Sequence, residues 1–280
     1  MDKKRIAQRF SRALKTYDRE AFVQRAIAER MAHLLTAYTV LPDRARIFEF
    51  GCGTGIYSRL LFRRFRPDRF LLNDLCPEAE APCFQRLVQD FSETDARLFP
   101  ESTKGILEKC LHFQAGDVED MDFSAGWDLI TSCSALQWLE QPERFLARCR
   151  RALRQGGALA VSTFGPETLR EIRVLSGSGL KYHSLPEWKE RFESAGFRML
   201  YAEERQFSHV FPSPKAVLRH LKDTGVTGVS ESTRPWTPER LRRFSEEYRR
   251  RFPAAATKTG GEQPVTLTYQ PLYFVAGRAD

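Results

Sequence analysis

A glycine-rich turn with an acidic residue just before it is the first feature of the sequence that could do chemistry. The segment Arg46 to Gly55, RIFEFGCGTG, begins as an apolar run typical of a strand and ends with Gly51, Gly53 and Gly55. Glycines at every second position permit positive φ angles and let a ligand approach the bare main chain. Glu49, at the strand end, would repel a pyrophosphate but attract an ammonium group. An ordinary tight turn is the alternative, and the strand before it and helix after it favour a cofactor site.

Glu49 favours S-adenosylmethionine, which carries an ammonium group that NAD lacks, and two further acidic residues follow predicted strands. Asp74 ends the predicted strand Arg69 to Asp74. It lies about 20 residues after the glycine turn, the spacing at which an acid reaches a ribose hydroxyl. Asn73 could share this role, although its side chain should point to the other face of the strand. Asp117 follows the strand Leu111 to Ala115, where it could accept a hydrogen bond from the adenine amino group while the N–H of Val118 meets a ring nitrogen.

Strand and helix patterns alternate five times along the first part of the chain. The fourth strand, Trp127 to Ser132, and the fifth, Ala158 to Thr163, complete this series. Such alternation predicts an α/β fold with a parallel, doubly wound sheet that binds ligands at the carboxyl ends of its strands. Four polar candidates for the cofactor site fall at such ends: Glu49, Asp74, Asp117 and Ser132.

The amino-terminal segment, residues 1–40, precedes the first strand and need not belong to the sheet. Lys3 to Leu35 has the apolar periodicity of two helices, with Asp18 as a plausible N-cap between them. We expect these helices to form a lid over the cofactor that brings Arg9, Phe10 and Tyr17 to the site. The alternative is simple packing on the flank of the domain.

Two helices interrupt the chain before its last predicted strand, Val265 to Ala276. Ser213-Pro214 and Thr237-Pro238 each place an N-cap before a proline at the first helical position. They open helices over Lys215 to Leu221 and Glu239 to Phe252. We therefore expect a helical cap at residues 213–263, inserted into a core formed by 41–212 and 264–280.

Composition indicates a globular protein with an acidic partner. The 280 residues are 42% hydrophobic and 29% charged, and no apolar run approaches the ~20 residues that span a bilayer. The basic start has no apolar signal segment, so we expect a cytoplasmic location. The six cysteines have no C-x-x-C spacing and indicate neither a metal site nor a disulfide framework. The formal net charge of +8 would attract an acidic protein, a nucleic acid or an anionic lipid.

The glycine turn and the strand-end acids resemble those of class I S-adenosylmethionine-dependent methyltransferases. That resemblance implies a Rossmann-like sheet of seven strands, with Phe197 to Arg205 and Val265 to Ala276 as the last two. Further stretches resemble one branch of these enzymes, the O-methyltransferases that act on malonyl-acyl carrier protein in biotin synthesis. They are FSRALKTYDREA (10–21), SCSALQWL (132–139), STFGPETLREI (162–172), LRHLKDTGVTG (218–228) and LTYQPLYFVAGR (267–278). Two features depart from that branch: a long segment at Pro77 to Cys110, and Cys133 where relatives often carry Asn.

The resemblance implies methyl transfer to the free carboxylate of a malonyl thioester on acyl carrier protein, whose methyl ester enters fatty acid synthesis on the way to biotin. A carboxylate is already ionised at neutral pH, so the reaction needs alignment and exclusion of water but no general base. Tyr17, Phe164 and Lys222 are candidates to orient or enclose the acceptor. The cofactor candidates are Arg9, Glu49, Gly51, Gly53, Gly55, Asp74, Asp117, Val118 and Ser132. The carrier is expected to be acidic and to dock on Arg219, Lys222, Arg242 and Arg243 of the cap.

Three other functions are compatible with parts of this sequence. The basic charge would suit an RNA methyltransferase, but SCSALQW lacks the Asn-Pro-Pro-Tyr box that holds a planar base, and we expect no nucleic acid partner. A methyltransferase for a quinone or lipid has the same core motifs and differs in the cap. A module that binds the cofactor without turnover is the third possibility.

Overall fold

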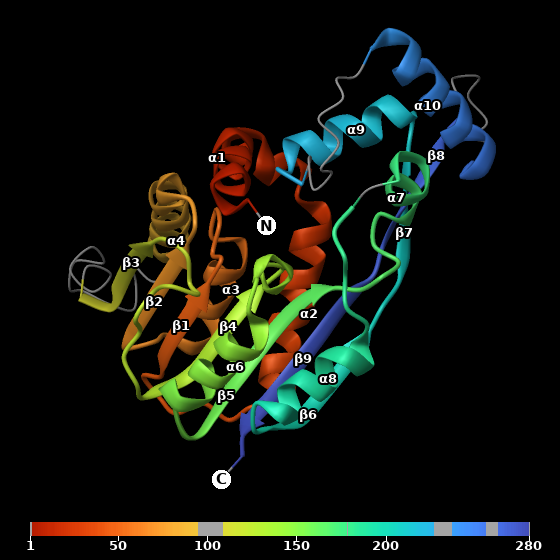
Figure 1. Ribbon diagram of the computed structural model, residues 1–280. Helices are drawn as coiled ribbons and strands as arrows, with labels where there is room; N and C mark the ends of the chain where they lie inside the picture. Colours follow the sequence, from red (N-terminus) through yellow and green to blue (C-terminus); the bar gives the residue numbers. More distant parts are fainter. Residues whose placement is uncertain (1, 95–108, 178, 227–236, 256–262, 280) are drawn as a thin grey trace.

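Seven strands form the central sheet of the computed structural model, which describes residues 2–94, 109–177, 179–226, 237–255 and 263–279. Their order across the sheet is β3-β2-β1-β4-β5-β9-β6 (Figure 1). The strands are β1 (Arg46–Phe50), β2 (Arg69–Asp74), β3 (Leu111–Ala115), β4 (Trp127–Cys133), β5 (Leu153–Phe164), β6 (Phe197–Glu204) and β9 (Pro271–Arg278). The predicted seven-stranded α/β fold is therefore confirmed.

The first five strands run parallel, and β9 is antiparallel to both of its neighbours, β5 and β6. All five parallel strands therefore present their carboxyl ends at one edge of the sheet. In Figure 1 this is the upper edge, which α1 covers. The predicted site residues at strand ends consequently meet in one place.

Two hydrophobic layers enclose the sheet, because alternate strand residues point to opposite faces. Ile47 of β1 packs into the layer with α2 (Phe22–Tyr38) and α3 (Ile56–Phe65). Phe48, its neighbour, packs into the other layer with α6 (Pro142–Ala152) and α8 (Leu185–Ser194). The helix α4 (Glu80–Thr94) packs beside α3.

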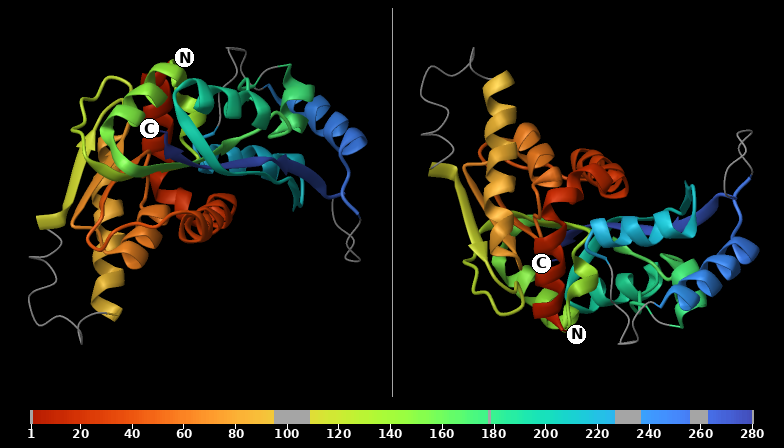
Figure 2. Two further views of the ribbon diagram at one scale, coloured as in Figure 1. Left: turned by 90° about the horizontal axis from the view of Figure 1, so that it is seen from below. Right: turned by 90° about the horizontal axis from the view of Figure 1, so that it is seen from above.

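The two amino-terminal helices occupy different places. The first, α1 (Lys3–Glu20), lies across the carboxyl ends of the strands, whereas α2 packs along the sheet against β4, β5 and β9 (Figure 2). Asp18 lies inside α1 and does not cap α2, so that prediction is wrong. The two helices are separated at Ala21, whose N–H caps the end of α1 by donating to the carbonyl of Tyr17.

The predicted last strand, Val265 to Ala276, is two strands. β8 (Val265–Tyr269) pairs with β7 (Phe207–Phe211) in a separate ribbon, and β9 begins at Pro271. The break falls at Gln270, whose carbonyl accepts the N–H of Gly165 and whose side-chain oxygen accepts the N–H of Glu167, at 2.7 Å in both bonds. The turn after β5 therefore holds Gln270 by its carbonyl and by its side chain at the point where β8 and β9 separate.

The cap helices α9 (Pro214–Asp223) and α10 (Pro238–Arg251) lie between β7 and β8 in the chain. Ser213 and Thr237 cap them as predicted, each accepting a backbone N–H three residues on. A short helix, α7 (Arg170–Ser176), packs against α10 and β8. A capping box of Ser184 and Glu187 opens α8. None of the helices that the structure describes has the length and apolar character needed to cross a membrane.

Candidate functional site

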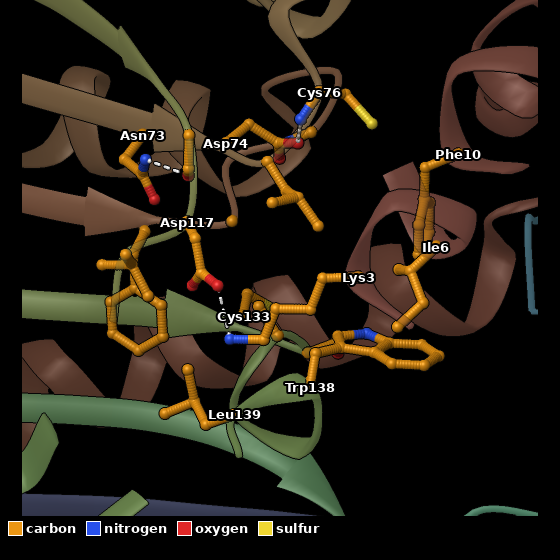
Figure 3. Close-up of a pocket in the computed structure, with 18 of the residues that line it drawn as sticks. Lys3, Ile6, Phe10, Asn73, Asp74, Cys76, Asp117, Cys133, Trp138 and Leu139 are labelled. Atoms are coloured by element: carbon orange, nitrogen blue, oxygen red, sulfur yellow. Dashed lines mark hydrogen bonds and ion pairs between the residues drawn. The ribbon is translucent and has the colours of Figure 1, made fainter. Parts of the chain in front are cut away.

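A pocket opens at the carboxyl ends of β1, β2, β3 and β4, beneath α1 (Figure 3). It encloses about 910 Å³, including the part that is open to solvent. Six predicted site residues line it: Tyr17, Gly51, Gly53, Asp74, Asp117 and Val118.

The glycine turn forms the floor of this pocket, and two of its glycines are required by geometry. A Cβ at Gly51 would lie 2.4 Å from the Cβ of Ala135, and one at Gly55 would lie 2.9 Å from the Sγ of Cys83. Both glycines also have positive φ, +66° and +81°. The turn can therefore pack closely against the β4 exit and α4, while Gly53 remains open on its Cβ side.

Asp74 fixes the geometry of the floor. Its carboxylate accepts the N–H of Gly53 at 2.8 Å and the N–H of Cys76 at 2.9 Å. Burial raises the pKa of Asp74, and these backbone hydrogen bonds oppose that rise. Asn73 also lines the pocket, and its amide donates to the carbonyls of Gln114 and Gly116, both at 2.9 Å. Asp74 thus ties the glycine turn to β2, and Asn73 ties β2 to the end of β3.

Asp117 meets a residue that was not predicted for the site, Lys3 of α1. The Nζ of Lys3 lies 2.6 Å from the Oδ2 of Asp117 and also forms an ion pair with Glu119. Burial lowers the pKa of Lys3, but the hydrogen bonds to the two carboxylates raise it above its usual value. Glu119 in turn accepts the N–H groups of Glu140 and Gln141 just before α6. The amino end of α1 is therefore tied to the corner predicted to hold adenine.

Glu49 lies under the glycine turn and does not line the pocket. It is 1% exposed, and burial raises its pKa to about 8, opposed by a hydrogen bond from Ser58. Its Oε2 has no hydrogen-bond partner among the described residues. Burial of a carboxylate oxygen without a hydrogen-bond donor is energetically costly, and a positively charged group beside it would offset that cost.

Helix α1 forms the roof of the pocket. Phe10 packs edge-on against Trp138, with ring centroids 5.9 Å apart, and Ile6 lies beside it (Figure 3). Near the other end of α1, Asp18 accepts the hydroxyl of Thr54 at 2.6 Å and forms an ion pair with Arg86 of α4. The roof is thus attached to the glycine turn and α4 as well as to Asp117 and Glu119.

The exit of β4 forms the wall beside the roof. Ser134 lines the pocket with a φ of +64°, an unusual backbone conformation for a residue other than glycine. Its N–H donates to the side chain and carbonyl of Ser162, and its carbonyl accepts the amide of Gln137 at 2.6 Å. Gln137 also accepts the hydroxyl of Thr163 at 3.1 Å. These bonds hold the backbone in place where Cys133 and Trp138 face the pocket.

Besides Glu49, five predicted site residues lie outside the lining: Arg9, Gly55, Ser132, Phe164 and Lys222. Arg9 is a half-buried residue of α1, and Lys222 is exposed on α9. Ser132 is buried beneath Gly51. Phe164 is buried at the end of β5, 6.4 Å from the rings of Tyr182 and Tyr269. Their proposed roles stay predictions.

Some lining residues were missed by sequence reasoning, and the reasons differ. Phe10 was expected at the site and lines the pocket, whereas Ile6 of the same apolar stripe was not assigned to it. The QWL segment after β4 contained Trp138 and Leu139 without showing which way they face. No local signal connects Lys3 with Asp117, because the two residues are 114 positions apart.

The residues of this pocket fit S-adenosylmethionine. Acidic side chains at two strand ends suit ribose hydroxyls and the adenine amino group, and Ile6, Leu75 and Leu139 offer apolar contacts for a purine ring. The orphaned oxygen of Glu49 suits the ammonium of the methionine part. The fold and pocket together define a class I S-adenosylmethionine-dependent methyltransferase.

Comparisons with known proteins agree with this class and refine it. A family model described as a methyltransferase domain matches residues 17–202. The chain is 45% identical to the malonyl-[acyl-carrier protein] O-methyltransferase of Bacteroides helcogenes, over 99% of this chain and 98% of the relative. It is 35% identical to the enzyme of the same name from Acinetobacter baylyi, again over 99% and 98%. The chain belongs to the family of malonyl-[acyl-carrier protein] O-methyltransferases.

Solved structures share the fold at lower sequence identity. A proposed methyltransferase of Bacillus halodurans C-125 superposes with a TM-score of 0.57 at 15% identity, covering 89% of this chain and 99% of that one. Phosphoethanolamine N-methyltransferase 2 of Haemonchus contortus, solved with S-adenosylhomocysteine, gives a TM-score of 0.50 at 15% identity, covering 90% and 53%. These likenesses establish the fold alone.

Proposed function

We propose that this enzyme transfers a methyl group from S-adenosylmethionine to the free carboxylate of malonyl-acyl carrier protein. The observation that carries this proposal is the near end-to-end similarity to relatives named for this reaction, which includes the cap segment. The pocket at the carboxyl ends of the strands supplies a matching cofactor site.

S-adenosylmethionine supplies an electrophilic methyl group when bound. The acceptor carboxylate is already ionised, so the protein has to orient it and to exclude water. The titratable groups at the roof have other tasks. Lys3 is held by two carboxylates. Tyr17 is a protonated phenol at neutral pH, and burial raises its pKa further above the usual value. A protonated Tyr17 can donate a hydrogen bond to an acceptor oxygen but does not remove a proton.

The acceptor side of the site remains a proposal built on Tyr17, Phe164 and Lys222. Tyr17 lines the cofactor pocket, and Phe164 marks the end of β5 beside the aromatic rings of Tyr182 and Tyr269. A malonyl group would be enclosed by such rings while its thioester arm leads outward toward α9, where Lys222 is exposed. We assign the lid function to residues 1–40 through α1, and the cap function to residues 213–263.

The carrier protein is proposed to dock on the cap. Arg219 and Lys222 of α9 are exposed, and neither forms an ion pair with a described residue. In α10, by contrast, Arg242 pairs with Glu246 at 2.7 Å and Arg243 with Glu239 at 2.6 Å. The α9 half of the predicted surface therefore offers more unneutralised charge than the α10 half. A cytoplasmic location and the lack of a nucleic acid partner stay predictions.

Mass measurement of purified carrier protein tests the function. Malonyl-acyl carrier protein incubated with enzyme and S-adenosylmethionine should gain the mass of one methyl ester. Acetyl-acyl carrier protein, which has the same arm but no free carboxylate, should gain nothing. Methylation of RNA or a quinone without methylation of malonyl-acyl carrier protein would overturn the proposal.

A further inference from the structure

The two long faces of α1 differ in chemistry. The inner face lines the cofactor pocket with Ile6, Phe10, Leu14 and Tyr17. The outer face is strongly basic and exposed: it carries Lys4, Arg5, Arg12 and Lys15. The helix that roofs the cofactor therefore presents cations to solvent on its opposite side.

The cations of this outer face have few acidic neighbours among the described residues. Within the part of the chain that the structure describes, Lys4, Arg12 and Lys15 form no ion pair with a carboxylate. Arg9, at the edge of this face, has its pKa lowered first by burial and then by the charges of Arg5 and Arg12, while the charge of Asp2 opposes the shift. Like charges crowded in this way repel one another, and an acidic partner would relieve that repulsion.

Helix α9 continues the basic surface. It contacts α1 directly: the hydroxyl of Thr16 donates to the carbonyl of Asp223 at 3.0 Å, and Phe10 packs against Gly225. Figure 2 shows the two helices side by side at the same end of the molecule, with α10 farther out. We call the combined surface the α1/α9 basic face; its residues are Lys4, Arg5, Arg12, Lys15, Arg219 and Lys222.

Both ends of α1 are attached to the cofactor site itself. At the amino end, Lys3 binds Asp117 and Glu119, and near the carboxyl end, Asp18 binds Thr54 of the glycine turn. A partner that binds the outer face would therefore hold the roof against the groups that contact the cofactor. Carrier protein bound at the outer face and cofactor bound at the inner face then favour the same position of α1.

We propose that the α1/α9 basic face binds an acidic surface of the carrier protein, and that this docking closes α1 over S-adenosylmethionine. The inference rests on the proposed function for the identity of the partner and extends it with a coupling between the two substrates. The carrier and the cofactor each tighten the binding of the other by the same factor, because linkage between two sites is reciprocal.

Binding measurements on the full chain test the proposal, with S-adenosylhomocysteine in place of the methyl donor so that no reaction occurs. In the wild type, saturating S-adenosylhomocysteine should tighten the binding of malonyl-acyl carrier protein by about fivefold or more, the lower end of typical coupling. The double variant Arg12→Glu/Lys15→Glu should weaken carrier binding by at least about tenfold at low salt. Its affinity for S-adenosylhomocysteine without carrier should stay within about twofold of wild type, which also verifies that the variant is folded.

The matched control is Arg151→Glu/Arg198→Glu, the same change of net charge at exposed positions near the amino ends of the strands. This control should alter carrier binding by less than about threefold. Equal weakening by the control and the α1 variant would overturn the docking face, and the absence of coupling in the wild type would overturn closure. Tighter binding of single-stranded RNA than of carrier protein would also overturn the carrier protein as the partner of this face. If malonyl-acyl carrier protein is bound but gains no methyl group, the proposed function fails while the docking result stands on its own.

Discussion

Two arginine-rich helices, α1 and α10, use similar compositions for different purposes. In α10 the arginines pair with glutamates of the same helix, at spacings of three or four residues, while Phe244 and Tyr248 face the core. In α1 the outer cations have no such partners, and the inner residues face the cofactor pocket. A count of basic residues does not separate these helices. What separates them is the placement of acids one turn away, which decides whether charge remains available to a partner.

Truncation of one aromatic residue in each helix should give the largest difference between α1 and α10, in stability and in ligand affinity. Phe10 of α1 packs edge-on against Trp138, with ring centroids 5.9 Å apart, and Phe244 of α10 packs edge-on against Tyr248, with ring centroids 5.5 Å apart. Phe244→Ala should lower the free energy of unfolding by about 3–5 kcal/mol, because it leaves a cavity in the core. Phe10→Ala should cost less stability but weaken S-adenosylhomocysteine binding by about tenfold to fiftyfold. Denaturant unfolding and calorimetry measure the two quantities, and similar profiles for both variants would contradict the division of roles.

The stability of the protein should depend on pH through Glu49 beneath the floor of the pocket, independently of α1. The folded-state pKa of Glu49 is raised to about 8, so the folded protein binds a proton there that the unfolded chain releases near pH 4.5. Stability of the ligand-free protein should therefore fall as pH rises from about 5 to 8. Glu49→Gln should remove this slope and add on the order of 2 kcal/mol of unfolding free energy at pH 8.

The same Glu49→Gln variant should bind S-adenosylhomocysteine more weakly at pH 8, because the ammonium loses its carboxylate. Unfolding curves and binding isotherms at several pH values provide the check. If the variant bound S-adenosylhomocysteine with wild-type affinity, Glu49 would have no role in binding the cofactor. Phe10→Ala should retain the wild-type pH slope, since its effect arises at the roof.

Loosening one attachment of α1 should have a smaller effect. Asp18→Asn keeps the shape of the side chain but removes the ion pair with Arg86, so S-adenosylhomocysteine binding should weaken by about fivefold. Glu29→Gln makes the same change of charge at an exposed position of α2 and should leave the affinity within experimental error. An equal loss in both variants would mean that net charge, and not the attachment of α1, controls affinity.

The smallest effect is expected from the arginines of α10. Arg242→Ala/Arg243→Ala should raise the KM for malonyl-acyl carrier protein by no more than about threefold, because these side chains already pair within their own helix. Steady-state kinetics at low and physiological salt measure this effect against that of the α1 double variant. A larger rise in KM for the α10 variant than for the α1 variant would instead support docking on the cap, as predicted from the sequence.

Much of the fold and half of the candidate site followed from local patterns. The bounds of β2 and β3 agree with the predicted strands, and the N-caps of α9 and α10 were correct, because these signals depend on neighbouring residues. The break at Gln270 was missed, since it arises from hydrogen bonds to a turn more than 100 residues earlier. Asp18 was assigned to a cap for a similar reason: its partners, Thr54 and Arg86, come from other elements.

The sequence by itself determined the cofactor side of this protein. A glycine turn after a strand and acids at the ends of the next strands occupy one edge of any parallel sheet built from this chain, because strand direction alone places them there. Only the tertiary structure decided what covers that edge. Lys3 reaches Asp117 and Phe10 reaches Trp138 through the path of α1 across the strand ends. Such contacts depend on how whole helices pack, and residue spacing within one helix carries no record of them.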